Sequence, residues 1–422
     1  MDKSVVTGLA PLDAPKHADG VAYVCSIAAA ALGALALWIP SGYSIGAVGL
    51  LLCSFWLLLK HGLPRLSVWE WALICTMFAY SIVWMIDALL RGDGVPGMDQ
   101  ASRFLFAIPV LLGVAHITLR WDLIWLGVGA GGYGALGIAV FQVYQNGMVR
   151  ASGFIGPEPF GNICALLASL SLLGAIWLHN EKRHPMLYLM TALGGFAAVA
   201  ALVLSSTRAG WLALFPVLLI ALVLLWVQAK GQQRLTVTAS ILVVLMLVGG
   251  LLLEPIGERV NATYSDLNNY FEGIGHPQSV GNRFELWKGS LHLFSQSPWL
   301  GWGTEAYRIE MGNLAESGYI KGDPNGANHA HNELIDALAK KGLLGGVLVL
   351  LIYIVPGLLF LRCFMQSSNN SRQILSIAGL AVVITSGLYG MAHTALENNA
   401  GVMNYAFWMS LLIGSVCARA SE

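Results

Sequence analysis

A histidine beside a predicted helix start is the residue best suited to acid–base chemistry in this sequence. His331 is followed by Asn332, a favourable helix cap, and by Glu333 in the first turn of a helix expected to end at Gly342. The positive end of a helix dipole disfavours an imidazolium, so we expect His331 to be neutral and able to accept a proton. His331 is our candidate general base, although a loop histidine that only makes ordinary hydrogen bonds fits the same position.

The same stretch offers a metal-binding alternative through His329, His331 and Glu333. Imidazole and carboxylate groups are common metal ligands, but residues two positions apart on a helix do not face the same side. The spacing therefore argues against a shared ion, and we predict a site without a metal or any other cofactor.

Arginine is the second residue type with a suggestive placement. Arg208 stands in a hydroxyl-rich junction between two apolar runs, and Arg283 opens an amphipathic segment. The guanidinium group can bind phosphate oxygens through two parallel hydrogen bonds, so both side chains are candidates for binding a diphosphate. Contact with lipid headgroups for Arg208 and simple solvation for Arg283 remain alternatives. Further candidates for donor or acceptor contacts are Arg150, Arg259, Arg308, Asn332 and Glu333.

These residues together suit a group transfer. They supply one base and several cations, whereas the sequence shows no evident nucleophile, nucleotide-binding loop or metal cage. Such a set fits a donor that already carries an anionic leaving group, such as a lipid diphosphate, because the arginines would stabilise the charge that develops as its bond breaks.

The composition of the chain is that of a membrane protein. Of its 422 residues, 56% are hydrophobic and only 11% are charged, and its mean hydropathy is +0.67. Soluble domains carry about 25% charged residues. The formal net charge is zero, which gives no basic field for nucleic acid, and the six cysteines lie in or beside apolar runs, where we expect no disulfide framework.

Twelve apolar runs are long enough to cross a bilayer as helices. They lie at 21–39, 43–59, 68–90, 104–119, 121–145, 160–179, 185–204, 209–228, 235–253, 343–364, 374–392 and 400–418. We therefore expect an all-α polytopic membrane protein with nine spans in 1–253, a large loop at 254–342 and three more spans in 343–422.

The distribution of lysine and arginine over the short loops predicts cytoplasmic N- and C-termini, which places the loop 254–342 outside the cytoplasm. That loop is expected to be partly helical. Phe284, Trp287, Leu291 and Phe294 would share one face of a helix that ends before Pro298, and this face could lie on the membrane surface or cap the bundle.

Four short motifs in this order and topology carry a resemblance to a known family. They are Ser-Thr-Arg-Ala-Gly (206–210), Asn282-Arg283 with Trp287, the segment Ser297–Gly303, and His331-Asn332-x-Leu334 leading to Gly342–Gly345. With the membrane spans on both sides, they resemble the O-antigen ligase/polymerase family of bacterial envelope glycosyltransferases over most of the chain.

The resemblance implies a GT-C-like enzyme of the bacterial inner membrane with a periplasmic active site. A ligase of this family moves O-antigen from undecaprenyl diphosphate to a sugar hydroxyl of lipid A-core, which completes lipopolysaccharide. The resemblance also implies that no metal is needed, that His331 is the base and that Arg208 and Arg283 bind the diphosphate. It further implies inversion at the anomeric carbon.

The family also contains O-antigen polymerases and protein O-oligosaccharyltransferases. A single dominant loop late in the chain favours a ligase, and we rank a polymerase second and protein glycosylation third. A transporter of lipid-linked glycans is the non-enzyme alternative. Charged residues of a transporter are expected near mid-bilayer, whereas here the polar residues gather at the outer edge, which favours an enzyme.

Overall fold

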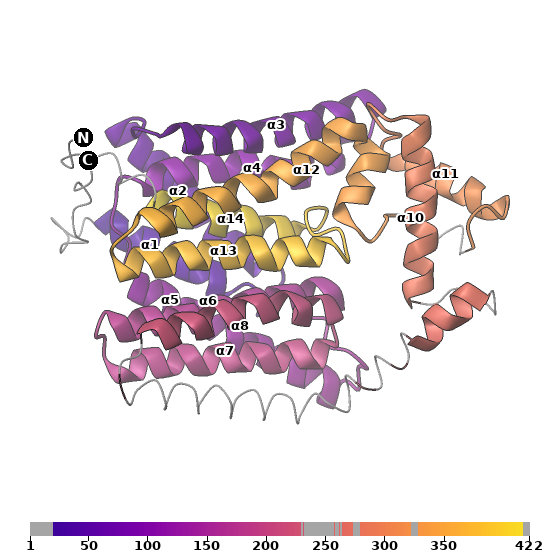
Figure 1. Ribbon diagram of the computed structural model, residues 1–422. Helices are drawn as coiled ribbons and strands as arrows, with labels where there is room; N and C mark the ends of the chain where they lie inside the picture. The colour runs from indigo at the N-terminus through magenta and orange to yellow at the C-terminus, as the bar shows by residue number, and fades with distance from the viewer. Residues whose placement is uncertain are drawn as a thin grey trace. The chain divides into compact units, whose positions relative to one another are not determined.

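The computed structural model of the chain describes residues 20–228, 231, 257, 261, 264–272, 279–321 and 328–416 (Figure 1). Over these residues every regular element is a helix and none is a strand, which confirms the all-α prediction for the described part. The chain divides into two compact units. The first comprises Met1–Val217, Leu348–Gly390 and Ala395–Glu422, and the second comprises Leu218–Val347 and Met391–Thr394.

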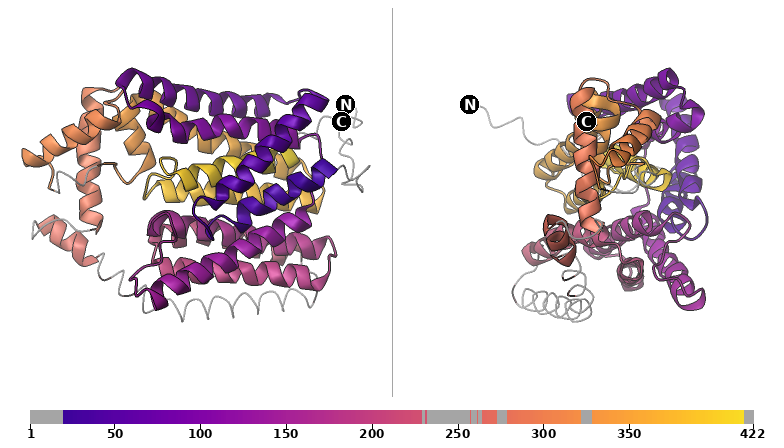
Figure 2. Two further views of the ribbon diagram at one scale, coloured as in Figure 1. Left: turned by 180° about the vertical axis from the view of Figure 1, so that it is seen from behind. Right: turned by 90° about the vertical axis from the view of Figure 1, so that its right-hand side faces the viewer.

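The first unit is a bundle of helices that lie alongside one another (Figure 2). Its helices are α1 (Gly20–Ala34), α2 (Gly42–His61), α3 (Val68–Arg91), α4 (Gly94–Val114), α5 (Trp121–Val140), the π-helix η1 (Phe141–Gln145), α6 (Pro157–Asn180), α7 (Pro185–Ser205), α13 (Asn370–Gly390) and α14 (Asn399–Val416). The start of α8 (Arg208–Gln228) and the end of α12 (Glu333–Gln366) also belong to it.

Seven described helical segments are long and apolar enough to cross a membrane. They are Gly42–His61, Val68–Arg91, Trp121–Gln145, Pro157–Asn180, Pro185–Ser205, Glu333–Gln366 and Asn370–Gly390. This finding agrees with a multi-pass membrane protein. The expected run at 235–253 lies outside the described residues, so the total of twelve spans and the periplasmic loop stay predictions.

Helix α4 begins ten residues before the apolar run that predicted it. Its first turns are polar, but Asp99 and Arg103 form an ion pair one helical turn apart. Such a pair stabilises a helix in which the hydrophobic pattern alone gives no signal. The boundary error therefore comes from reading the helix by hydropathy only.

Glycines let α5 pack closely against two neighbours. A Cβ placed on Gly131 would lie 2.2 Å from the carbonyl oxygen of Gly33 in α1, and one on Gly132 would lie 1.9 Å from that of Gly194 in α7. Small residues of this kind allow helix backbones to approach one another in membrane bundles.

The second unit contains α10 (Ser279–Gln296), α11 (Thr304–Glu316), a helical segment at 264–272 and the first part of α12. A small hydrophobic core joins α10, α11 and α12. Its members are Leu286, Leu293, Tyr307, Met311, Ile320 and Ala339. The helix predicted after Gly281 is confirmed. The side of it that packs on this core carries Leu286 and Leu293, which were not on the predicted apolar face. Leu291, on the predicted apolar face, is 46% exposed.

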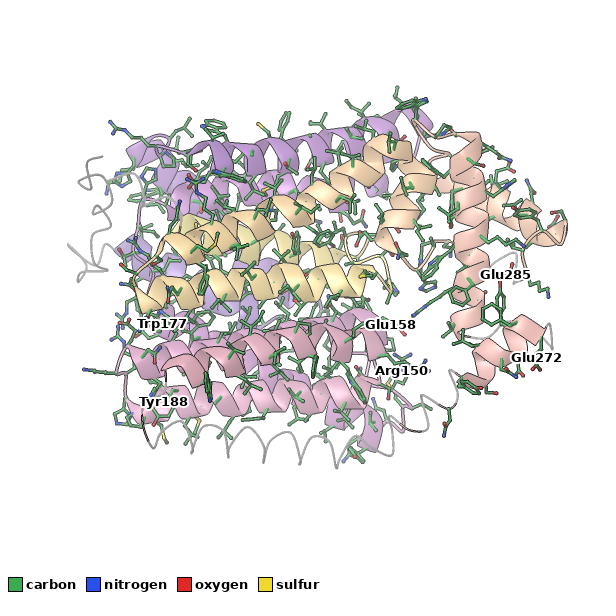
Figure 3. The ribbon with its side chains drawn as sticks, in the orientation of Figure 1. Arg150, Glu158, Trp177, Tyr188, Glu272 and Glu285 are labelled. Atoms are coloured by element: carbon green, nitrogen blue, oxygen red, sulfur yellow. The ribbon has the colours of Figure 1, made fainter. Side chains whose placement is uncertain are left out.

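Two buried carboxylates hold the second unit together, and one of them, Glu285, is labelled in Figure 3. Glu285 accepts hydrogen bonds from the hydroxyl of Tyr270 at 3.0 Å and from the backbone N–H of Lys321 at 2.9 Å. Asp266 accepts one from the backbone N–H of Val280 at 2.6 Å. Because these bonds join segments from both sides of α10, they fix the helix that carries Arg283.

Candidate functional site

The turn before α12 positions the candidate base. His331 has a backbone φ of 51°, a left-handed conformation that is uncommon for residues other than glycine. The side chain of Asn332 then caps the helix, since its Oδ1 accepts the N–H groups of Leu334 and Ile335 at 3.1 Å each. The helix start predicted from the sequence is confirmed, and it places His331 directly outside the first turn.

A buried ion pair fixes the same turn from within α12. Asp336 Oδ1 accepts the backbone N–H of Ala330 at 2.7 Å, and its Oδ2 lies 2.8 Å from Lys340 Nζ. The Lys340 ammonium also lies over the Tyr307 ring, 5.2 Å from its centroid. Lys340 is therefore an internal partner of the residue that holds the backbone next to His331.

The turn after α10 packs against the end of this helix. Helix α12 is interrupted at Gly342, whose φ is 66° and ψ is −162°. On one side of the interruption the N–H of Gly303 donates to the carbonyl of Lys340 at 2.8 Å, and on the other the N–H of Leu343 donates to that of Pro298 at 2.7 Å. The tryptophan- and glycine-rich motif thus fixes the end of the helix that follows His331.

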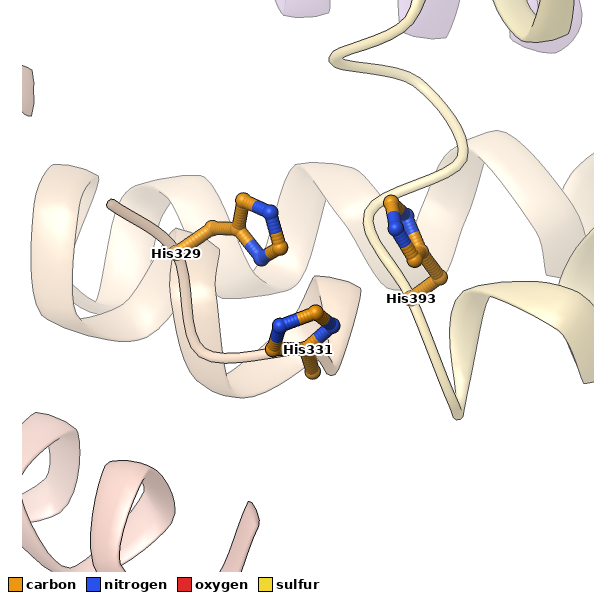
Figure 4. Close-up of side chains that lie close together, drawn as sticks. All are labelled: His329, His331 and His393. Carbon is orange, nitrogen blue, oxygen red and sulfur yellow. The ribbon is translucent and has the colours of Figure 1, made fainter. Parts of the chain in front are cut away.

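Three histidines gather beside this helix start (Figure 4). The ring centroids of His329 and His331 are 4.1 Å apart, and His393 lies 5.1 Å from the first and 5.2 Å from the second. One nitrogen from each ring lies within 4.8 Å of the others. The side-chain amide of Asn332 donates to the carbonyl of Met391 at 3.1 Å, which ties the segment carrying His393 to the helix start.

The surroundings keep His331 neutral in the protein without substrate. The pKa of His331 is lowered from its ordinary value of 6.5 to about 3. Burial is the main cause, and the charges of His329, His393 and Arg283 add to it. The neutral imidazole was predicted from the helix dipole, so the expected state agrees but its principal cause is desolvation.

Arg283 and His331 belong to the same unit, and the arginine is near enough for its charge to act on the histidine. Arg283 lies half-buried in α10. Arg208 is an exposed residue at the start of α8 in the first unit. The hydroxyl of Thr207 donates to the carbonyl of Pro157 at 2.8 Å, and Ser206 has a φ of 52°, so a defined turn precedes Arg208.

Two of the further candidates make ion pairs. Arg150 lies 2.8 Å from Glu158, and its Nε donates to the carbonyl of Ser205 at 2.9 Å (Figure 3). Arg308 pairs with Glu305 on the exposed face of α11. These contacts explain the placement of both arginines without a ligand. Arg259 lies outside the described residues, Asn332 is the helix cap, and Glu333 is buried.

Comparison with known proteins relates part of the chain to a family. A family model described as "O-Antigen ligase" matches residues 193–350. This part of the chain carries the junction at Arg208 and the turn at residues 329–332 before α12, the histidine turn. The chain is 31% identical to the "O-antigen ligase" of Escherichia coli over 231 residues. Both matches point to the O-antigen ligase family for this part of the chain. The match spans 51% of this chain and 53% of that relative, so it covers about half of each.

The likeness to a second relative extends over more of the chain. It is an uncharacterized protein of Haemophilus influenzae, 25% identical over 380 residues, which are 87% of this chain and 92% of that protein. The likeness to this relative therefore extends beyond residues 193–350.

Sequence reasoning missed His393 and Asp336 as parts of the site. The pairing of Asp336 with Lys340 had a signal, because the two residues stand four positions apart in a predicted helix. His393 had none, since 62 positions separate it from His331 and only the fold brings them together. The helical-spacing argument against a histidine–metal site also fails, because His329 and His331 precede the helix and do not lie on it.

Proposed function

We propose that this protein is an O-antigen ligase: a metal-independent glycosyltransferase of the inner membrane that moves O-antigen from undecaprenyl diphosphate to a sugar hydroxyl of lipid A-core. The observation that carries the proposal is the half-buried His331 at the start of α12, with the cation Arg283 close enough to act on it. A base and a phosphate-binding cation are the pair of groups that this transfer requires.

His331 is assigned the role of general base. Its imidazole takes the proton of the acceptor hydroxyl as that oxygen attacks the anomeric carbon. The bond from this carbon to the diphosphate oxygen breaks, and the bonding electrons leave with undecaprenyl diphosphate. A single displacement of this kind inverts the anomeric configuration.

Arg283 is assigned to the diphosphate, and Arg208 is proposed as its second ligand. Guanidinium groups would stabilise the negative charge that grows on the leaving group. The donor also tunes the base, because a bound diphosphate offsets the charge of Arg283 and so raises the pKa of His331 from its low value in the free protein. Donor binding would therefore make His331 a stronger base.

The proposal places the second unit in the periplasm and both termini in the cytoplasm. No ATP is available there, so the energy for transfer comes with the lipid diphosphate donor. An O-antigen polymerase, or a protein O-oligosaccharyltransferase, would use the same donor and the same residues with a different acceptor. A lipid-linked glycan transporter would require neither a base nor an acceptor.

A transfer assay with purified protein tests the proposal. Undecaprenyl-diphosphate O-antigen and lipid A-core are mixed with wild type or with His331→Asn, in the presence of EDTA and without ATP. Asparagine tolerates the left-handed backbone of His331, so this variant removes the imidazole with the least backbone strain. Loss of a general base lowers rates by about 100- to 10,000-fold.

Lipopolysaccharide ladders from wild type would support ligase activity. A rate lowered by about 100- to 10,000-fold in His331→Asn would support His331 as the general base. Equal rates in the two proteins would remove His331 from that role. Elongated lipid-linked glycan in place of lipopolysaccharide would identify a polymerase. The control variant is His292→Asn, the same substitution at a histidine of α10. It should keep the wild-type rate because His292 lies outside the histidine cluster.

A further inference from the structure

The three-histidine cluster has a chemistry that the transfer reaction does not use. We propose that His329, His331 and His393 bind one borderline divalent cation, of which Zn²⁺ is the type, and that the bound cation inhibits the protein. The transfer needs one imidazole, whereas the structure brings three to one place from two segments of the chain.

The ligand set selects the class of cation. Imidazole nitrogen favours Zn²⁺, Cu²⁺ and Ni²⁺, whereas Mg²⁺, Ca²⁺ and Mn²⁺ prefer carboxylate and carbonyl oxygen. Among the described residues, the cluster consists of histidines alone. Three protein ligands also leave the fourth tetrahedral position of zinc open to water or to an anion.

The spacing of the three histidine nitrogens is close to that of a site with zinc bound. With Zn–N bonds of about 2.0–2.1 Å, tetrahedral ligand nitrogens stand about 3.4 Å apart. The three nitrogens here lie within 4.8 Å of one another, so rotations of the rings by about 1 Å at their tips would close the site. No shift of the backbone is required for a change of that size.

The backbone of both ligand segments is already fixed. Asp336 holds the N–H of Ala330, between the first two histidines, and Asn332 holds the carbonyl of Met391, two residues before the third. A preformed backbone lowers the ordering cost of binding a ligand. The arrangement is therefore suited to capture a cation without refolding.

One contact opposes binding and sets its strength. The backbone N–H of Thr394 donates to Nδ1 of His393 at 2.9 Å. A neutral imidazole that accepts at Nδ1 carries its proton on Nε2, so coordination has to disrupt this hydrogen bond or shift the tautomer. We therefore expect a reversible regulatory site, weaker than a structural zinc site whose histidines are oriented by acceptors.

Inhibition follows from the shared ligand, and this part of the inference rests on the proposed function. A nitrogen of His331 that is coordinated to a cation cannot accept the proton of an acceptor hydroxyl. Cation binding and proton transfer are therefore mutually exclusive, and a chelator should restore the activity in full.

The experiment measures cation binding apart from activity. Full-length protein in detergent is titrated with ZnCl₂ by calorimetry, and with CoCl₂ by visible absorption, which reports tetrahedral coordination. Wild type is compared with His393→Gln, His329→Gln and the control His292→Gln. We expect one equivalent bound to wild type and to the control, and an affinity at least about 10-fold lower in each cluster variant, because each loses one of three ligands.

Transfer is then measured with and without ZnCl₂. Inhibition of wild type that EDTA reverses, together with a folded His393→Gln protein whose own rate does not change when ZnCl₂ is added, would support the regulatory role. Absence of binding, or equal affinity in all four proteins, would overturn the site whether or not the protein transfers O-antigen. Binding with unchanged or increased transfer would overturn the inhibition. A raised melting temperature with ZnCl₂ in wild type, absent from the cluster variants, checks the site where calorimetry is limited by protein yield.

Discussion

At the scale of single residues, the site depends on groups whose surroundings change their ordinary chemistry. His331 combines a left-handed backbone with a half-buried imidazole whose pKa is lowered to about 3. The neutral state leaves the ring able to accept a proton or a cation. Arg283 contributes to that state and is also the proposed diphosphate ligand, so one cation has two effects on the same site.

Arg283→Ala should impair use of the donor and leave the affinity for the acceptor unchanged. Loss of a group that stabilises developing charge lowers kcat by about 100-fold or more. Arg283→Lys should recover only part of the rate, because lysine supplies the charge without the bidentate fork. Steady-state kinetics with each substrate varied separately check this.

The matched control is Arg308→Ala, an arginine of the same unit that pairs with Glu305 on an exposed surface. It should behave as wild type. If Arg283→Ala raised the KM for the acceptor alone, the assignment of Arg283 to the diphosphate would be wrong.

At the scale of elements, α10, α11 and the first part of α12 form a support for the histidine turn. The sequence predicted the helix at α10, the cap at Asn332 and the stop at Gly342 because hydrophobic spacing, capping chemistry and glycine are local signals. It did not predict that Lys340 would be 2% exposed or that Asp336 would be its partner. Whether an ion pair is buried depends on the elements that cover it, so a local sequence pattern cannot predict the burial.

Asp336→Asn should destabilise the second unit and weaken the position of His331. The substitution leaves the buried Lys340 without its carboxylate, and removing one partner of a buried pair costs about 3–5 kcal/mol. Thermal unfolding of the purified protein measures this loss. Glu305→Gln, which breaks an exposed ion pair in α11, should leave the melting temperature nearly unchanged.

The double variant Asp336→Asn/Lys340→Met separates charge from hydrogen bonding. It removes the unpaired ammonium, so stability should rise above that of Asp336→Asn. A double variant no more stable than Asp336→Asn would show that the pair itself is not the source of the loss.

Gly342→Ala should disturb the turn after α10. A Cβ at this position would lie 2.3 Å from the carbonyl carbon and oxygen of Trp299, and the φ of 66° disfavours alanine as well. Transfer and melting temperature should both fall. Gly357→Ala is the control in the same helix, where a Cβ meets only ordinary contact with Val383 at 3.7 Å, and it should be tolerated.

At the scale of the whole molecule, composition predicted the class of protein and the fold class, and the described helices agree with both. Membrane helices are predictable because a bilayer requires long apolar segments. The site was predicted less completely, because His393 reaches it from a segment after α13 that carries no motif of its own. Contacts between segments distant in sequence require the fold.

The predicted orientation can be tested by labelling. In a background in which the six native cysteines are replaced, Ser317→Cys should react with an impermeant maleimide from the periplasm. Lys182→Cys, between α6 and α7, should react only after the inner membrane is opened; both positions are exposed. The reverse pattern would invert the topology and move the proposed active site to the cytoplasm.

The interruption of α12 at Gly342 has a consequence for how the gene can vary in length. In an uninterrupted helix, one inserted residue would turn everything beyond it by about 100°. Here the backbone is anchored on both sides of the break, by Gly303 to Lys340 and by Leu343 to Pro298. An insertion or deletion in the apolar half of α12 therefore leaves both of these hydrogen bonds in place, and we expect the histidine turn to keep its own conformation.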